Sequence, residues 1–290
     1  MIKNIFKLLR PSQWIKNGVV LAGLIFAGKA RDISLAEKAI LVMLAFCLLS
    51  SAVYIINDIF DRRRDKIHPL KKDRPIASGK ISIKLAWVLA FIIAFGGLLL
   101  TFKISTATLY VSLSYLALNI LYTILLKNVV IIDVMTIAAG FVLRALAGAV
   151  AINVEFSGWL LNTTFVLALF LGLGKRRHEI IFLQKEAISH RKILEKYSPY
   201  LLDQLIGVVT ASTVITYLFY TLSSEVQAKL HTNFLFVTIP FVIYGIFRYL
   251  YLVHKEEQGG SPTTLLLTDR PLLLDVVLWF ASIITILYIL

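Results

Sequence analysis

Apolar runs long enough to cross a lipid bilayer recur along the whole chain, and they constrain its fold more than any other feature. A spanning helix needs about 20 mostly apolar residues. Runs that approach this length occupy residues 17–29, 39–57, 84–102, 106–125, 130–151, 158–174, 205–222, 233–253 and 272–290. Segments of this length suit helices rather than barrel strands. The sequence therefore predicts an all-α, polytopic membrane protein, a single bundle of about nine transmembrane helices over residues 1–290.

The positive charge is unevenly divided between alternate loops. The formal net charge is +13, yet, with the N-terminus inside, the external segments hold only a few basic residues, namely Lys29, Arg31, Lys38, Lys103 and Lys229. Cytoplasmic loops of membrane proteins carry such an excess of Lys and Arg. We expect a multi-pass protein of the inner (plasma) membrane, with its N-terminus cytoplasmic and its C-terminus outside. Short basic loops beside a membrane do not favour a nucleic acid as partner.

Two cytoplasmic loops are longer than the other connections and carry many charges. They cover residues 58–84 and 175–204, and the second has the mixed composition of an interfacial helix. Functional residues concentrate on such loops, so we expect both to cap an active site on the cytoplasmic side. A charged motif follows the second span and another follows the sixth, which is the spacing that two four-helix halves plus one extra helix would give.

An acidic motif directly follows the second apolar run. Asp58, Asp61 and Asp65 are spaced i, i+3 and i+7, so on a helix they share one face, with Asn57 beside them. Carboxylates at the water edge of a membrane helix are costly unless a cation joins them. Mg²⁺ prefers one or two carboxylates together with substrate phosphates. We therefore expect Mg²⁺ and a diphosphate here; the alternative is a solvated helix end paired with the basic residues 62–64.

A second polar group lies at the turn between the fourth and fifth spans, where Tyr122, Lys127 and Asp133 occur. Arg144 lies on the same helix face as Asp133 and about 16 Å deeper, at 1.5 Å per residue. A charge at that depth must face the bundle interior or a wet cavity. Arg144 is either a structural residue bonded to backbone carbonyls or to Asp275, or a ligand for a lipid phosphate or substrate hydroxyls.

Lys175, Arg176 and Glu179 follow the sixth span, where the twofold spacing predicts a second ligand site. Lys and Arg can hold phosphate oxygens, although an ordinary basic flank of the span would look the same. In the N-terminal segment 10–17, Lys16 is either a membrane anchor or a contact for an anionic headgroup. Gly140 and Gly148 are expected to allow close helix packing.

These motifs together resemble the UbiA superfamily of intramembrane prenyltransferases. Residues 57–65 match its NDxxDxxxD motif, the segment 74–79 is similar to the loop signature that follows, and Tyr122 and Lys127 are similar to its Tyr…Lys pair. The resemblance implies a nine-helix bundle in which two Asp-rich motifs hold an isoprenyl diphosphate through magnesium. Residues 175–179 depart from that pattern, because they contain only one carboxylate.

The decaprenyl-phosphate phosphoribosyltransferase branch of the superfamily shares this departure, and residues 10–17 and 141–145 are also similar to it. The resemblance implies transfer of 5-phosphoribosyl from phosphoribosyl diphosphate (PRPP) to a polyprenyl phosphate, with release of diphosphate. The expected metal ligands are Asp58, Asp61 and Asp65, which with Asp133 form the expected catalytic set. The expected substrate-binding residues are Asn57, Lys16, Arg74, Tyr122, Lys127, Arg144, Lys175, Arg176 and Glu179.

Two other functions are compatible with the sequence. A prenyltransferase would move an isoprenyl chain from its diphosphate to an aromatic or quinone precursor and would use the same first Asp motif. A non-enzymatic transporter or lipid-binding protein would explain the spans and the intramembrane Arg144. Assembly into a homo-oligomer is left open by the sequence.

Overall fold

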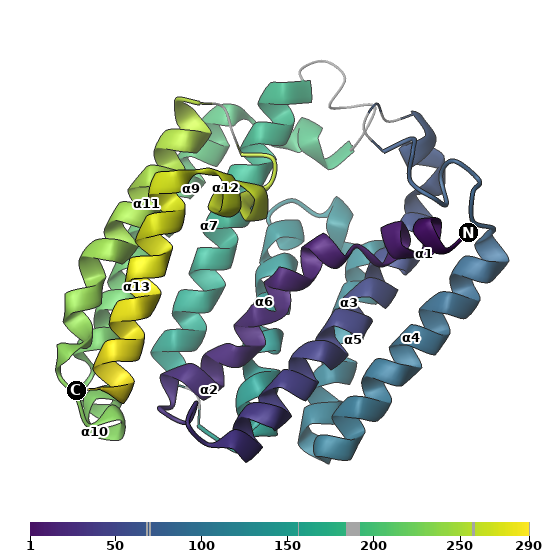
Figure 1. The fold of residues 1–290 in the computed structure, drawn as a ribbon. Helices are drawn as coiled ribbons and strands as arrows, with labels where there is room; N and C mark the ends of the chain where they lie inside the picture. Colours follow the sequence, from purple (N-terminus) through teal and green to yellow (C-terminus); the bar gives the residue numbers. More distant parts are fainter. Residues whose placement is uncertain (68, 70, 156, 184–191, 257–258, 290) are drawn as a thin grey trace.

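The computed structural model describes all residues except 68, 70, 156, 184–191, 257–258 and 290, and the described residues form helices and no strand (Figure 1). The helices are α1 (Ile2–Leu9), η1 (Pro11–Leu21), α2 (Ala22–Phe26), α3 (Ile33–Ile67), α4 (Ile83–Ile104), α5 (Thr106–Ile124), η2 (Leu126–Asn128), α6 (Ile132–Ala151), α7 (Gly158–Leu183), η4 (Lys192–Lys196), α9 (Pro199–Leu222), α10 (Ser224–Leu230), η5 (Phe234–Thr238), α11 (Ile239–His254), α12 (Pro262–Thr268) and α13 (Arg270–Tyr288).

The described residues include eight helices that are long and apolar enough to cross a membrane. They confirm the predicted all-α, polytopic class. The predicted count of nine transmembrane helices is approximate, because eight such helices are found among the described residues. The first predicted span, at 17–29, is not a long α-helix but the 3₁₀ helix η1 followed by the short α2.

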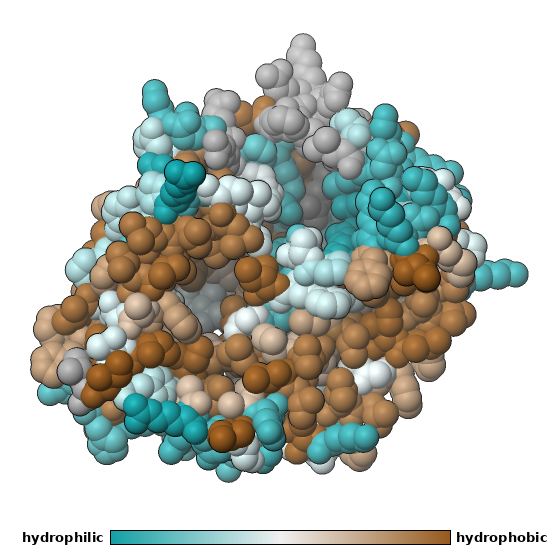
Figure 2. Space-filling view, viewed as in Figure 1, coloured by the Kyte–Doolittle hydropathy of each residue, from teal (hydrophilic) through white to brown (hydrophobic). Residues whose placement is uncertain are grey.

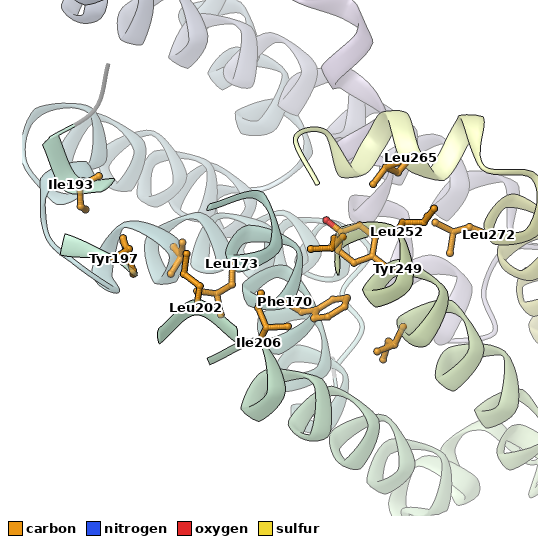
Figure 3. Close-up of a cluster of buried hydrophobic side chains, with 13 residues drawn as sticks. Phe170, Leu173, Ile193, Tyr197, Leu202, Ile206, Tyr249, Leu252, Leu265 and Leu272 are labelled. Atoms are coloured by element: carbon orange, nitrogen blue, oxygen red, sulfur yellow. The ribbon is translucent and has the colours of Figure 1, made fainter. Parts of the chain in front are cut away.

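The long helices divide into two neighbouring groups, α3–α6 and α7–α13 (Figure 1). One apolar cluster joins α3, α5, α6 and η1 through residues such as Phe46 and Tyr115, whose ring centroids are 5.1 Å apart. A second cluster joins α6, α7, α9, α11 and α13, with Phe170 and Tyr249 near its centre (Figure 3). Val134 of α6 belongs to the second cluster, so α6 connects the two halves and their polar ends lie side by side.

Apolar side chains also cover the outside of the bundle. Figure 2 shows a broad hydrophobic belt between two hydrophilic rims. Phe91 and Phe95 of α4 belong to the exposed apolar set. Such a large apolar surface is far beyond what soluble monomers expose. The chain is a multi-pass membrane protein.

Close packing holds η1 and α2 against α6. A Cβ atom added to Gly148 would lie 1.8 Å from the carbonyl oxygen of Val20, and one added to Gly23 would lie 2.9 Å from the Cα atom of Ala149. Only glycine fits such approaches. The predicted packing role of Gly148 is confirmed, and it fixes the N-terminal segment along the bundle interior.

Both loops predicted to be cytoplasmic are shorter than expected, because the flanking helices continue beyond the predicted apolar spans. Helix α3 runs to Ile67, so the acidic motif is helical, and the loop extends from there to Ser82, the N-cap of α4. Helix α7 runs to Leu183, so residues 175–179 are helical as well. The interfacial helix predicted for the second loop falls largely on 184–191, which lie outside the described residues.

Candidate active site

The three aspartates of α3 form an acidic ridge near its C-terminal end. Asp58 and Asp65 are 2% and 4% exposed, and Asn57 lies beside Asp58, half-buried. One nitrogen of Arg74, Nη1, is 2.9 Å from Oδ1 of Asp58 and 2.7 Å from Oδ2 of Asp65. Arg10 also contacts Asp58, at 2.5 Å. The spacing argument thus placed the carboxylates on one face correctly.

The loop between α3 and α4 presents Arg74 to this ridge. Ile76 is 1% exposed and packs against Leu8 of α1 and Ile55 of α3. A turn then closes at Gly79, whose φ of +76° favours glycine. Ile76, two residues after Arg74, anchors the loop and leaves Arg74 pointing at Asp58 and Asp65. Arg74 is one of the predicted substrate-binding residues.

Lys127 is a buried cation that joins η2 to the ridge. It is 8% exposed, and its Nζ lies 2.7 Å from Oδ1 of Asp61. Tyr122, in the last turn of α5, interacts electrostatically with Arg176 of α7. The predicted Tyr122 and Lys127 pair therefore lies between the acidic ridge and the second charged group.

The second charged group centres on Arg176, which is 3% exposed. Its Nε lies 2.8 Å from Oδ2 of Asp133 and its Nη1 lies 2.6 Å from Oε2 of Glu179. Lys175, on the outer side of the same helix turn, lies 3.9 Å from Oε1 of Glu179. Two carboxylates from α6 and α7 thus surround one guanidinium, and this group also contains Tyr197, whose hydroxyl donates to Asp133 at 2.8 Å.

Arg144 lies deep in the bundle and is 7% exposed. It donates to Asn17 Oδ1 at 2.9 Å, to the Gly140 carbonyl at 3.0 Å and to the Tyr115 hydroxyl at 2.7 Å. Pairing with Asp275 is therefore wrong: that carboxylate lies against Gly245 of α11. Within the described part of the chain, every hydrogen-bond partner of Arg144 is neutral, which leaves a buried cation without a counter-charge.

Lys16 of η1, the residue before the apolar run 17–29 begins, brings a second cation toward Arg144. Burial lowers the pKa of its ammonium group to about 8, and the nearby positive charges of Lys175, Arg144 and Arg10 lower the pKa further in the same direction. These four cations come from α7, α6 and the N-terminal segment. Arg10 is paired with Asp58 and Lys175 with Glu179, so Lys16 and Arg144 are the members of this group without a carboxylate partner among the described residues, and they suit an anion.

The ridge has the donor chemistry that Mg²⁺ prefers. Among the described residues, no group of three or more His, Cys, Asp or Glu side chains lies close enough to hold a metal ion by itself. Mg²⁺ commonly uses only one or two protein carboxylates and completes its shell with phosphate and water. Asp58 and Asp65 both approach one nitrogen of Arg74, so a cation can contact both. These residues fit Mg²⁺ bound together with a diphosphate.

Several residues of the site were not predicted individually. Arg10 and Asn17 belong to the noted N-terminal segment, but nothing in that segment indicates which side chains they contact. Tyr115 and Tyr197 gave no signal at all, since an isolated tyrosine in an apolar span or a charged loop is ordinary. All of them make contacts between residues that are distant in sequence, such as Arg144 with Asn17.

Comparison with known proteins decides the family. The sequence pattern of the UbiA prenyltransferase family matches residues 18–268. The chain belongs to this family. It is 31% identical to decaprenyl-phosphate phosphoribosyltransferase of Mycolicibacterium smegmatis over 98% of this chain and 92% of the relative. It is 32% identical to the enzyme of that name from Corynebacterium glutamicum over 99% of this chain and 87% of the relative.

The UbiA fold is equally clear from solved structures. A UbiA homologue from Archaeoglobus fulgidus, determined with GPP and Mg²⁺ bound, superposes with a TM-score of 0.74 at 20% identity and covers 99% of this chain and 100% of the homologue. At that identity the likeness concerns the fold. The bundle described above is therefore a UbiA bundle, with the polar ends of its two halves meeting on one side.

Proposed function

We propose that this UbiA family member transfers 5-phosphoribosyl from PRPP to a polyprenyl phosphate in a Mg²⁺-dependent reaction that releases diphosphate. Two relatives named decaprenyl-phosphate phosphoribosyltransferase match it over almost its full length, which supports phosphoribosyl transfer to a polyprenyl phosphate. The reaction would take place on the cytoplasmic side of the inner membrane, where the soluble donor is present, beneath a cap formed by the two cytoplasmic segments.

The observation that carries the proposal is that the second site is built on two cations, Arg176 and Lys175, interleaved with the carboxylates Asp133 and Glu179. Arg176 lies at its centre, with Lys175 beside it, and α7 contributes only Glu179 as a carboxylate. A second Mg²⁺ that carried diphosphate would meet the cations Arg176 and Lys175 here, and not another ridge of aspartates. Arg and Lys suit the additional phosphate of PRPP, which an isoprenyl diphosphate does not have.

The donor diphosphate is assigned to the ridge formed by Asp58, Asp61 and Asp65. Mg²⁺ held there would offset the charge that develops on the departing diphosphate. Lys127 and Arg74 would contact the same group, since both already lie against ridge carboxylates. Asn57, next to Asp58, completes this set.

The ribose is assigned to the space between the two charged groups. Transfer at an anomeric carbon passes through an oxocarbenium-like state. Asp133 would bind a ribose hydroxyl or stabilise that positive charge, because a carboxylate that already accepts from Arg176 and Tyr197 still has free lone pairs. Glu179, 2.6 Å from Nη1 of Arg176, and Tyr122 are assigned to the ribose together with Asp133.

The acceptor phosphate is assigned to the electropositive neighbourhood of Lys16 and Arg144. A phosphate monoester has a second pKa of about 6, so it is largely ionised near neutral pH. One oxygen of the acceptor phosphate forms the new bond to the anomeric carbon. The bond between that carbon and the diphosphate oxygen breaks, and the electron pair of the broken bond leaves with the diphosphate. No general base is required, and an anionic ligand supplies the counter-charge that Arg144 lacks among the described residues.

The alternative is transfer of an isoprenyl group to an aromatic or quinone precursor. It is favoured by the first Asp motif and by the fold shared with the A. fulgidus homologue, which was solved with GPP and Mg²⁺. The two functions differ in the donor that the ridge accepts.

Thermal unfolding in detergent distinguishes the donors. PRPP with Mg²⁺ at about a hundred times its dissociation constant should stabilise the purified protein by roughly 2.7 kcal/mol, whereas geranyl diphosphate should not. The Asp58→Asn variant should lose the PRPP effect, since it removes a carboxylate from the ridge. Stabilisation by geranyl diphosphate alone, together with failure of liposomes containing the protein to form a phosphoribosylated lipid, would overturn the proposal in favour of the alternative.

A further inference from the structure

Tyr197 lies in the second cytoplasmic segment, between η4 and α9, yet its hydroxyl reaches the start of α6. The ring is 4% exposed and belongs to the apolar cluster that contains Ile193 and Leu202 (Figure 3). Its oxygen accepts the backbone N–H of Ile131 at 2.6 Å and donates to Oδ1 of Asp133 at 2.8 Å. Burial raises the pKa of this hydroxyl and the bond to Asp133 raises it further, so it stays protonated and able to donate.

Ile131 has an unfavourable backbone conformation. Its φ is +69° and its ψ is −47°, a region that a β-branched residue rarely occupies. Such strain persists only where surrounding contacts hold it, and it gathers at functional sites. The Ile131 side chain is 43% exposed, so it gains little from packing. The Tyr197 hydroxyl is the contact that fixes its N–H.

The strained turn separates two residues that the proposed reaction uses. On one side, Lys127 extends to Asp61 of the acidic ridge; on the other, Asp133 accepts from Arg176 of the second group. A change of the backbone angles at Ile131 would therefore move the diphosphate contact and the ribose contact relative to each other. Displacements of about 1 Å at such sites can slow a reaction by about a hundredfold.

We propose that Tyr197 is a positioning residue: its hydroxyl holds the turn at Ile131 and thereby fixes Lys127 and Asp133 in the relative positions that group transfer requires. The inference rests on the proposed function, in which these two residues contact the donor. Tyr197 itself touches neither reacting group. Through the contact of Tyr197 with the turn at Ile131, the second cytoplasmic segment becomes part of the catalytic geometry.

The test compares Tyr197→Phe with Tyr249→Phe in liposomes supplied with PRPP, Mg²⁺ and a polyprenyl phosphate. Both tyrosines belong to the same apolar cluster, but the Tyr249 hydroxyl is buried without a hydrogen-bond partner among the described residues. Tyr197→Phe should lower kcat at least tenfold while changing the KM for PRPP less than threefold. Tyr249→Phe should stay within twofold of the wild type, and both variants should have similar thermal midpoints.

A second substitution separates positioning from a general loss of structure. Glycine adopts positive φ without a steric penalty, so Ile131→Gly in the Tyr197→Phe background should restore kcat at least threefold. Hydrogen exchange should also rise at residues 129–133 in Tyr197→Phe and not in Tyr249→Phe. A Tyr197→Phe variant with wild-type kcat, or a double variant without recovery, would overturn the inference.

Failure of the proposed function would give a different result. The wild-type protein would then form no phosphoribosylated lipid but would transfer an isoprenyl group, and the ratio of Tyr197→Phe to wild-type kcat would be measured with that donor. A ratio near one overturns the positioning role with either donor, whereas a wild type active with PRPP supports the function whatever the ratio.

Discussion

Lys16 is the proposed acceptor contact whose charge changes at moderately alkaline pH. Its pKa is lowered to about 8, mainly by burial, while the acceptor phosphate keeps its charge throughout the range above pH 7. Protonated Lys16 binds an anion and neutral Lys16 does not. The affinity for polyprenyl phosphate should therefore fall above pH 8, by up to about tenfold per pH unit. Titration of acceptor binding between pH 6.5 and 9.5 measures this.

Lys16→Arg is the matched control, because a guanidinium stays protonated over this whole range. The arginine variant should bind the acceptor with nearly constant affinity from pH 7 to pH 9.5. The same decline in both proteins would mean that another group titrates and that Lys16 does not contact the phosphate.

The Asp61–Lys127 pair should contribute to folding as well as to the site. Lys127 is nearly buried and Asp61 is about one-fifth exposed. Removing one member leaves the other charge uncompensated, so Asp61→Asn and Lys127→Met should each destabilise the protein by about 2–3 kcal/mol, below the range for fully buried pairs because of the exposure of Asp61. The double variant should be at least about 1 kcal/mol more stable than the sum of the two losses predicts.

Unfolding in mixed detergent micelles provides the free energies for this cycle. Glu155→Gln is the control, since Glu155 is 96% exposed and its contact with Lys229 lies at the surface; it should cause no measurable loss. Strict additivity of Asp61→Asn and Lys127→Met would mean that the two side chains do not interact.

Sequence reasoning at this scale succeeded where a local pattern carries the information. The i, i+3, i+7 spacing placed Asp58, Asp61 and Asp65 on one helical face. It did not supply the partners of these residues, because Arg10 and Arg74 reach Asp58 across 48 and 16 residues of chain. No periodicity encodes such contacts, and for the same reason Tyr197 was missed.

At the scale of elements, the N-terminal segment η1–α2 depends on its approach to α6. Gly148→Ala would place a methyl group 1.8 Å from the Val20 carbonyl oxygen, a clash with backbone that no side-chain rotation relieves. Overpacking of this kind typically costs about 1–3 kcal/mol. We expect Gly148→Ala to lower the free energy of unfolding by about 2 kcal/mol. We also expect it to weaken acceptor binding at Lys16.

Gly18 provides a control in the same segment, because a Cβ added there would meet nothing within 4 Å. Gly18→Ala should leave stability and acceptor binding close to wild type. Equal thermal midpoints for Gly148→Ala and Gly18→Ala would show that η1 does not depend on this contact.

The helices were predictable to the extent that apolar length determines them. Spans such as 84–102 and 130–151 correspond closely to α4 and α6. The predicted first span failed as an α-helix because Pro11 begins a 3₁₀ segment of eleven residues, a conformation that sequence patterns rarely indicate. The predicted loops were too long because charged residues end a membrane span without ending its helix.

At the scale of the molecule, the charge bias predicts a cytoplasmic N-terminus and a cytoplasmic acidic ridge. The only cysteine, Cys47, is buried, so new cysteines can report topology without a background signal. Asn233 and Lys72 are both exposed and lie in segments predicted to face opposite sides. A membrane-impermeant maleimide should label Asn233→Cys in intact cells, and should label Lys72→Cys only after the membrane is permeabilised.

The reverse labelling pattern would contradict a cytoplasmic active site, because the acidic ridge lies on the same side as residue 72. Labelling of both positions in intact cells would indicate leaky membranes, which a soluble cytoplasmic marker protein detects. The spacing of charged motifs predicted two four-helix halves with one extra helix at the end, whereas the long helices group as α3–α6 and α7–α13. The contact between the polar ends of the two groups required the three-dimensional structure.

The depth of Arg144 has an electrical consequence. It lies about 16 Å along α6 from Asp133 at 1.5 Å per residue, so an anion bound there would have travelled through part of the voltage drop across an energised membrane. Transfer of one charge across the full drop is worth about 2.3 kcal/mol per 100 mV. With a negative interior, this field would draw a doubly charged lipid headgroup outward onto Arg144. A respiring cell would thus load its acceptor more readily than a de-energised one.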